Sequence, residues 1–141
     1  RAPLGISIQG GGVLGISGIS SDMREVEAAA AEGDERAILS LKMYQYRVKK
    51  YIGSYAAAMG GVDIVVFTGG IGENSPDDRE KICENMEYMG LEFDSKANEG
   101  VRGKETLISK KDSKVKVMIV PTNEEWVIAS ETKDIVEKMK K

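Results

Sequence analysis

The spacing of apolar and polar positions predicts helices and strands that follow one another along the chain. The clearest pattern predicts a helix over residues 34–59, where apolar residues recur every three or four positions and form one stripe. Two shorter apolar runs, at 63–68 and 114–122, are typical of strands that enter a buried sheet. The stripe of the long helix comprises Ala37, Leu41, Tyr44, Val48, Ile52, Tyr55 and Met59.

The amino-terminal part is less regular. Residues 1–11 fit no element and are expected to be a linker or a non-native leader. Residues 13–20 are expected to form an extended segment interrupted by glycines. A helix follows, in which Asp22 and Glu25 resemble a capping box and Gly33 is a natural stop.

A glycine-rich segment follows the first strand, with Gly69, Gly70 and Gly72 within four positions. Glycine permits positive φ and lets another group approach the backbone closely. Ser75 before a proline and two acids then marks the start of a helix, which is expected to reach about Met89. The segment matches neither the triphosphatase loop nor the dinucleotide fingerprint. Its local sequence therefore leaves two interpretations open, a nucleotide-binding loop and a plain tight turn.

The carboxyl-terminal part is predicted to add a surface excursion, a strand and a helix. The polar, glycine-bearing residues 90–105 form the excursion, and Thr122 with Glu125 would form a capping box for the last helix. The resulting order of strand, helix, helix, strand, helix, strand and helix argues for a layered α/β domain. Ligands bind such sheets at the carboxyl ends of strands, so Thr68 and Thr122 are expected to face one crevice.

Composition narrows the class of protein. The chain has 141 residues, a net charge of −3, 30% charged and 41% hydrophobic residues, as an ordinary soluble domain has. It has no strong basic patch and no long apolar stretch, so neither nucleic acid nor a membrane is expected as a partner. A single cysteine, Cys83, is expected to be a core residue and fits a reducing cytoplasm. The chain has no histidine, so acid–base chemistry within it would fall to carboxylates or lysines.

Three motifs together resemble a known family. The segments GISGISSDMRE (15–25), FTGGIGENSP (67–76) and VPTNEE (120–125) are similar, in this order and spacing, to the carboxyl-terminal half of the acetate kinases. This acetokinase family belongs to the superfamily of actin, sugar kinases and heat-shock chaperones. The resemblance implies that residues 12–141 form a ribonuclease-H-like α/β domain, a mixed sheet flanked by helices.

The resemblance also implies a nucleotide site for ATP or ADP in the glycine-rich segment. Gly70 and Ile71 would lie along the adenosine, Gly72 belongs to the same cofactor-binding segment, and Asn74 would contact the polar edge of the base. These roles agree with the residue types, because glycine allows close approach, isoleucine supplies an apolar face and asparagine supplies hydrogen-bonding groups.

Three further residues match binding positions of the family. Asp22 and Arg24 would form the adenine side of the pocket, although by themselves they indicate a helix cap and a surface ion pair. Glu124 matches an acidic residue linked to Mg²⁺, although by itself it is a common first-turn acid of a helix.

The family reaction transfers the γ-phosphoryl group of ATP to a short carboxylate, with Mg²⁺, and gives an acyl phosphate and ADP. The catalytic arginines, aspartate and histidines of the family have no counterpart here, so no catalytic residue is assigned and the chain alone is not expected to catalyse. A homodimer through the 34–59 helix is expected. Two alternatives stay open: a propionate kinase, and a non-catalytic assembly domain with the same fold.

Overall fold

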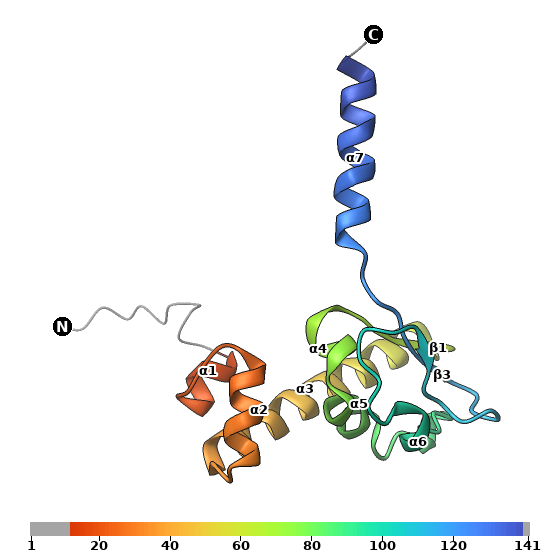
Figure 1. The fold of residues 1–141 in the computed structure, drawn as a ribbon. Coiled ribbons are helices and arrows are strands. Elements are labelled where there is room, and N and C mark those ends of the chain that lie inside the picture. Colours follow the sequence, from red (N-terminus) through yellow and green to blue (C-terminus); the bar gives the residue numbers. More distant parts are fainter. Residues whose placement is uncertain (1–11, 140–141) are drawn as a thin grey trace.

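The structure is a computed structural model that describes residues 12–139, without the side chain of Glu124. The expected linker, residues 1–11, lies outside the described part. The chain folds into a small α/β body from which the last helix projects (Figure 1). Its elements are α1 (Gly12–Ser17), α2 (Met23–Ala31), α3 (Glu35–Met59), β1 (Ile64–Phe67), α4 (Gly69–Asn74), α5 (Pro76–Cys83), the 3-10 turn η2 (Glu87–Met89), α6 (Ser95–Asn98), β2 (Thr106–Leu107), β3 (Lys116–Ile119) and α7 (Glu124–Met139).

The sheet is mixed, as the resemblance implied. Its order is β1-β3-β2, with β1 parallel and β2 antiparallel to β3. Strand residues alternate between the two faces, so Val65 and Phe67 are buried while Ile64 and Val66 are about half exposed. The buried face of β3 completes the core with Val117 and Ile119.

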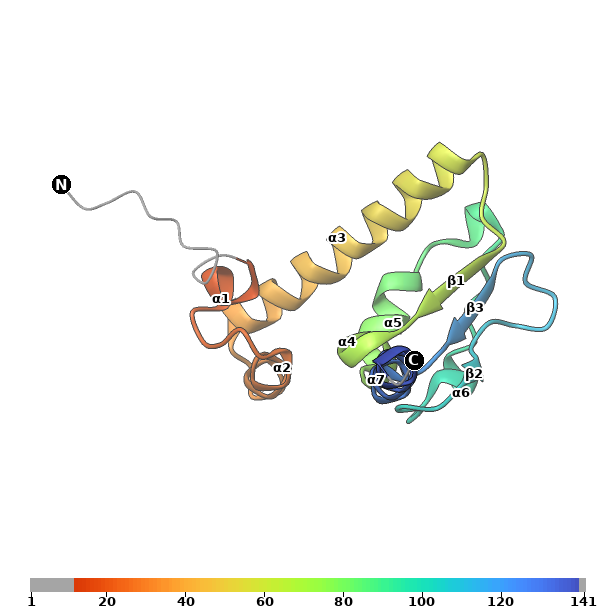
Figure 2. The ribbon, with the colours of Figure 1, turned by 90° about the horizontal axis from the view of Figure 1, so that it is seen from above.

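Helices α3 and α5 cover the buried face, and Figure 2 shows α5 between α3 and the strands. The α3 helix confirms the clearest prediction, with Asp34 as its N-cap and Gly60 at φ +76° as its C-cap. The predicted apolar stripe is buried or half-buried except in its last part, where Tyr55 and Met59 are exposed. Cys83 is buried in the core, which raises the pKa of its thiol to about 12 and confirms the prediction of a core residue.

The amino-terminal predictions need one correction. Residues 12–17 form helix α1 and are not extended, because α1 is held against α3 by hydrogen bonds that local sequence does not reveal. The guanidinium of Arg36 donates to the carbonyl of Ile16, and the Ser40 hydroxyl donates to that of Val13. Asp22 caps α2 as predicted, but its own N–H donates to Ser20 and leaves the capping box half formed.

The carboxyl-terminal predictions were also wrong in part. Helix α5 ends at Cys83, not near Met89, and the supposed excursion at 90–105 contains the buried residues Leu91 and Asn98. The Thr122–Glu125 capping box does not form, because the Thr122 hydroxyl bonds elsewhere and the side chain of Asn123 accepts from the N–H of Trp126 instead. None of the described helices is long and apolar enough to cross a membrane.

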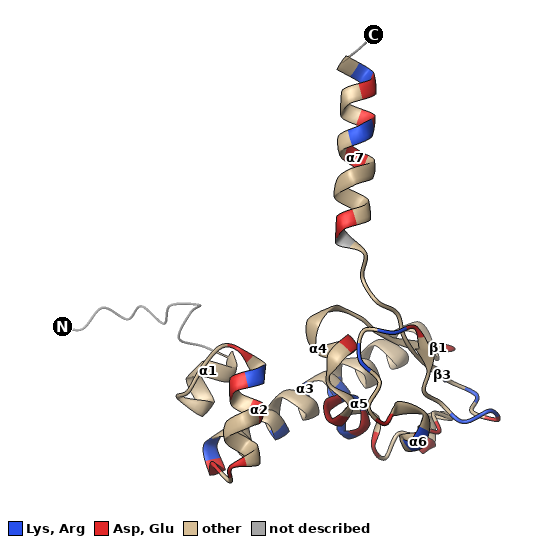
Figure 3. Ribbon diagram, viewed as in Figure 1, with Lys and Arg blue, Asp and Glu red and all other residues tan. Residues whose placement is uncertain are grey.

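Charged residues of both signs are interleaved along α2, α5 and α7 (Figure 3). One of them, Arg79 of α5, is fully buried. Its guanidinium donates to the carbonyls of Gly72 and Val101 and to the side chain of Asn98, at 2.7–2.9 Å. Burial lowers the pKa of Arg79, and no carboxylate of the described residues forms an ion pair with it. It therefore ties α4, α6 and the 99–105 loop together through neutral acceptors.

We expect Arg79→Met to lower the free energy of unfolding by about 3 kcal/mol or more, because three acceptors lose their buried donor. Urea unfolding followed by circular dichroism measures the change. Lys81→Met makes the same substitution at an exposed site on the same helix and should stay within about 0.5 kcal/mol of wild type. A change at Arg79 as small as that at Lys81 would contradict the cross-linking role.

Candidate functional site

The ends of β1 and β3 are joined by one carboxylate oxygen. Oε1 of Glu73 accepts from the N–H of Gly69 at 2.8 Å, from the N–H of Thr122 at 2.7 Å and from the Thr122 hydroxyl at 2.9 Å. These bonds lower the pKa of Glu73, and the N–H of Thr122 has the largest effect. Thr68 and Thr122 were expected to face one crevice; the structure brings the two strand ends together at one edge of the sheet, but neither threonine lines the pocket between α4 and α2.

The same carboxylate explains why the glycine-rich segment is a helix and not an open loop. Thr68 is extended and its side chain caps nothing, while Gly69 turns the chain at φ +73°. Glu73 lies one turn further on and accepts from the N–H of Gly69, as an N-cap side chain would. The N–H of Gly69 is thus already used and does not receive an anion.

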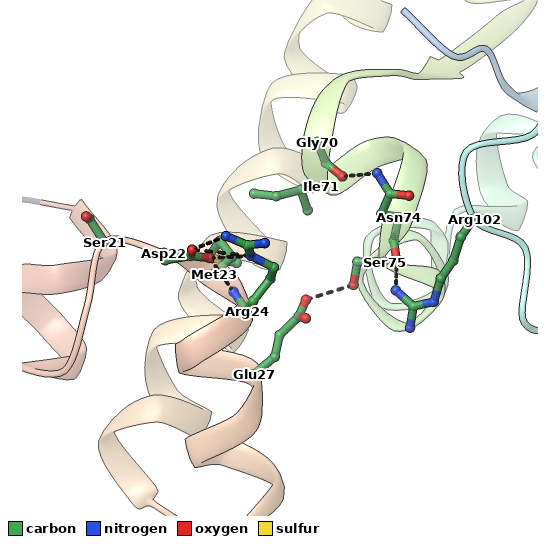
Figure 4. A pocket seen from close by; sticks show the side chains of 10 residues that line it. All are labelled: Ser21, Asp22, Met23, Arg24, Glu27, Gly70, Ile71, Asn74, Ser75 and Arg102. Carbon is green, nitrogen blue, oxygen red and sulfur yellow. Dashed lines mark hydrogen bonds and ion pairs between the residues drawn. The ribbon is translucent and has the colours of Figure 1, made fainter.

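A pocket of about 510 Å³ opens between α4 and the start of α2 (Figure 4). It brings together five of the residues that the resemblance assigned to a nucleotide, although they come from two distant motifs. The pocket is lined by Ser21, Asp22, Met23, Arg24, Glu27, Gly70, Ile71, Asn74, Ser75 and Arg102.

The α2 side of the pocket consists of an ion pair on a helix cap. Asp22 accepts from the N–H of Arg24 at 3.0 Å, and its carboxylate also pairs with the guanidinium of Arg24 at 2.6 Å. The hydrogen bonds from the side chain and the N–H of Arg24 lower the pKa of Asp22 to about 2. The cap and the ion pair that the sequence indicated are both present, and both residues line the pocket.

The α4 side presents a small, an apolar and a polar group. Gly70 has no heavy atom within 4 Å of the place where a Cβ would stand, so its backbone is open to the pocket. Next to it lies the half-buried Ile71. The amide of Asn74 donates to the carbonyl of Gly70 at 3.0 Å. Gly72 is not among the lining residues, because it packs against the backbone of Phe67, where a Cβ would stand 3.3 Å away.

Several lining residues were not identified from the sequence. Glu27 lies one turn after Arg24 on α2, so helical spacing could have indicated it. Arg102 comes from the 99–105 loop, where its guanidinium donates to the carbonyl of Asn74, and no local pattern connects it with the pocket. That loop is held by the bond from the N–H of Gly103 to the carbonyl of Glu73.

The described residues contain no cluster of three or more acids or cysteines that could hold a metal ion. The donor set therefore does not fit a complete Mg²⁺ site built by this part of the chain. Glu124, the predicted metal residue, begins α7, but its side chain lies outside the described part. Its link to the metal stays a prediction.

The structure is thus an α/β domain with a pocket between the start of α2 and α4, the helix that follows β1. The model of the acetokinase family matches residues 7–130, and the chain belongs to this family.

The relatives show how much of such a protein the chain covers. It is 64% identical over 125 residues to the acetate kinase of Porphyromonas gingivalis, a match that covers 89% of this chain and 31% of that protein. The crystal structure of Porphyromonas gingivalis acetate kinase superposes with a TM-score of 0.84 at 62% identity, over 90% of this chain and 32% of the other. A propionate kinase from Francisella tularensis superposes with a TM-score of 0.76 at 38% identity, over 92% of this chain and 34% of the other. The chain thus spans about a third of the length of these relatives.

We expect the free energy of unfolding of Glu73→Gln to fall less than that of wild type as the pH is lowered. A carboxylate with a lowered pKa stabilises the fold fully above the ordinary pKa of glutamate, about 4.3, and loses this effect as the pH falls through the pKa of the folded state. The stability gap between wild type and Glu73→Gln should therefore be widest at neutral pH and narrow in acid. Urea unfolding over a pH series measures the gap, with the exposed Glu105→Gln as the control. A gap that does not change with pH would contradict the role of the ionised carboxylate.

Proposed function

We propose that this chain forms the adenosine-binding side of the nucleotide site of an acetate kinase. The observation that carries the proposal is the single pocket that joins Asp22 and Arg24 of one motif to Gly70, Ile71 and Asn74 of another. Membership of the acetokinase family supports the choice of ligand. Most of the surface that lines the pocket is apolar, and a few polar groups are held in place on it, as in small-molecule sites.

The chemistry of the lining residues suits an adenosine. The bare backbone at Gly70 would let a flat ring approach closely, and Ile71 would cover one face of that ring. Nδ2 of Asn74 donates one of its two hydrogens to the carbonyl of Gly70, and its Oδ1 could accept from the exocyclic amino group of adenine. Arg24 lies on the opposite side, where its exposed guanidinium could reach the base or the ribose.

Phosphoryl transfer is proposed for the whole protein and not for these 141 residues alone. ATP would be the donor, and phosphates together with groups of the whole protein would hold Mg²⁺. Acetate is preferred to propionate as the acceptor, because the acetate kinase relative is 64% identical and the propionate kinase structure 38%. A cytoplasmic location is proposed, since the buried Cys83 is the only cysteine.

A homodimer is proposed through an exposed face of α3. Met43, Tyr46, Lys50, Tyr51 and Ser54 line a groove there together with Arg47. The aromatic rings are 50–61% exposed, and aromatic residues are enriched in the centres of interfaces. Tyr51 also stacks with Tyr55, at 6.2 Å between ring centroids, so the aromatic surface continues along α3.

The nucleotide site is tested by titrating ADP into the chain and following amide shifts by NMR. Shifts should cluster at residues 69–74 and near Asp22 and Arg24. Gly70→Val should abolish them, because the valine would occupy the open surface, and it should leave the fold intact, since no atom lies within 4 Å of the new Cβ. Ala58→Val, which adds the same side chain at an exposed site of α3, is the matched control. Shifts centred elsewhere, or unchanged in Gly70→Val, would contradict the assignment.

We expect the chain to sediment as a dimer at micromolar concentration and Tyr46→Asp to shift it towards monomer. The reason is that a carboxylate buried at the centre of an interface loses its hydration without gaining a partner. Glu131→Lys on α7 alters charge away from the groove and should leave the association unchanged. A wild-type chain that stays monomeric over a hundredfold range of concentration would contradict the dimer.

A further inference from the structure

The two sides of the pocket belong to different parts of the fold, and Glu27 joins them. The α2 side packs on α3, whereas the α4 side follows β1 and leads into α5. Across the pocket, the hydroxyl of Ser75 donates to Oε1 of Glu27 at 2.9 Å (Figure 4). Ser75 is itself the N-cap of α5, so this bond reaches from α2 directly to the start of α5.

A second acid lies behind this bond. Asp78 is 2% exposed, and its Oδ1 accepts from the side chain of Gln45 on α3 at 2.9 Å. Its Oδ2 is buried and has no hydrogen-bond partner among the described residues. The charge of Asp78 acts on Glu27 and raises its pKa, which indicates that the two carboxyl groups are neighbours. A protonated Glu27 can donate to the carboxylate of Asp78, whereas an ionised Glu27 cannot.

We propose that Glu27 is a positioning residue of the nucleotide pocket, and that in its protonated form it holds the α2 side against α5 by accepting from Ser75 and donating to Asp78. This role rests on the proposed nucleotide site. No other hydrogen bond between the lining residues of the described chain joins the α2 side to the α4 side, and the packing of α2 and α5 on α3 supports the same arrangement.

The charges around Glu27 agree with a shared proton. Burial raises the pKa of Glu27 most and the charge of Asp78 raises it further, while the hydrogen bond from Ser75 and the charge of Arg102 lower it. Burial, and then the charge of Asp78, also raises the pKa of Tyr44, which faces Asp78 from α3. Arg102 and Arg24 are exposed and already bonded to the carbonyl of Asn74 and to Asp22, so they only partly neutralise the two acids.

The proton on Glu27 makes the binding of a ligand in the pocket depend on pH. When Glu27 ionises, it keeps the bond from Ser75 but can no longer donate to Asp78, and the repulsion between the two carboxylates favours a wider pocket. A ligand that touches both sides favours the closed arrangement and therefore the protonated acid. By linkage, its affinity is highest at low pH and falls as the pH rises through the pKa of Glu27.

Adenosine is the probe, because it carries no phosphate that titrates near neutral pH. Amide shifts of the wild-type chain give its dissociation constant from about pH 5 to about pH 8, and binding should weaken by more than about twofold as the pH rises over this range. Glu27→Gln should bind with the same constant within about twofold throughout, since glutamine accepts from Ser75 and donates to Asp78 at every pH. Glu32→Gln, which alters an exposed acid at the other end of α2, should follow wild type.

A ligand-free measurement accompanies the titration. The ¹³C shift of the Glu27 carboxyl should titrate above the ordinary glutamate range in wild type and move down in Asp78→Asn. Wild-type binding that does not change with pH, or a Glu27→Gln profile parallel to wild type, would overturn the positioning role and leave the nucleotide site intact. If adenosine binds no variant at any pH, the nucleotide site itself is wrong and this role falls with it.

Discussion

The carboxylate of Glu73 is the constraint on which the site depends. One oxygen takes up the N–H that begins α4 and both polar groups of Thr122, so the carboxyl ends of two parallel strands meet at one point. The backbone carbonyl of the same residue accepts from Gly103 and thereby fixes the loop that carries Arg102. Glu73 is buried at this point, whereas Gly70 on the same short helix is exposed and lines the pocket.

Helix α4 could not hold its shape without such contacts. It is six residues long and contains three glycines, whereas isolated helices of this length do not form in water and glycine weakens them further. Arg79 binds the carbonyl of Gly72 from one side, and Glu73 binds the N–H of Gly69 from the other. The guanidinium of Arg79 and the carboxylate of Glu73 do not pair with each other. Each is bonded to backbone groups or neutral side chains. These bonds fix the path of the main chain more closely than an ion pair between two side chains would. The glycine-rich segment is therefore held by hydrogen bonds from Arg79 and Glu73, despite a composition typical of flexible loops.

The elements that the sequence predicted are those whose signals are local. The long stripe of α3, the apolar runs of β1 and β3, and the Ser75 cap are each contained within one segment, and each was found in the structure. Helix α1 was missed because Arg36, on another helix, holds it. The motifs predicted five residues of the pocket, but not Arg102, whose place depends on a loop closed by Arg79 and Glu73. Long-range hydrogen bonds, which no periodicity records, account for these misses.

The two sides of the pocket differ in how firmly their polar groups are held. Asn74 is anchored by its side-chain bond to Gly70 and by Arg102 on its carbonyl, so its side chain is held in place beside the pocket. Arg24 is held only by Asp22, and the pair is exposed, so water and salt screen the attraction. The N-cap bond keeps Asp22 in position even when the guanidinium leaves it, because that bond goes to the backbone. In the proposed nucleotide site, Asn74 would therefore be the firmly held contact, and Arg24 would be the contact that adjusts to the ligand.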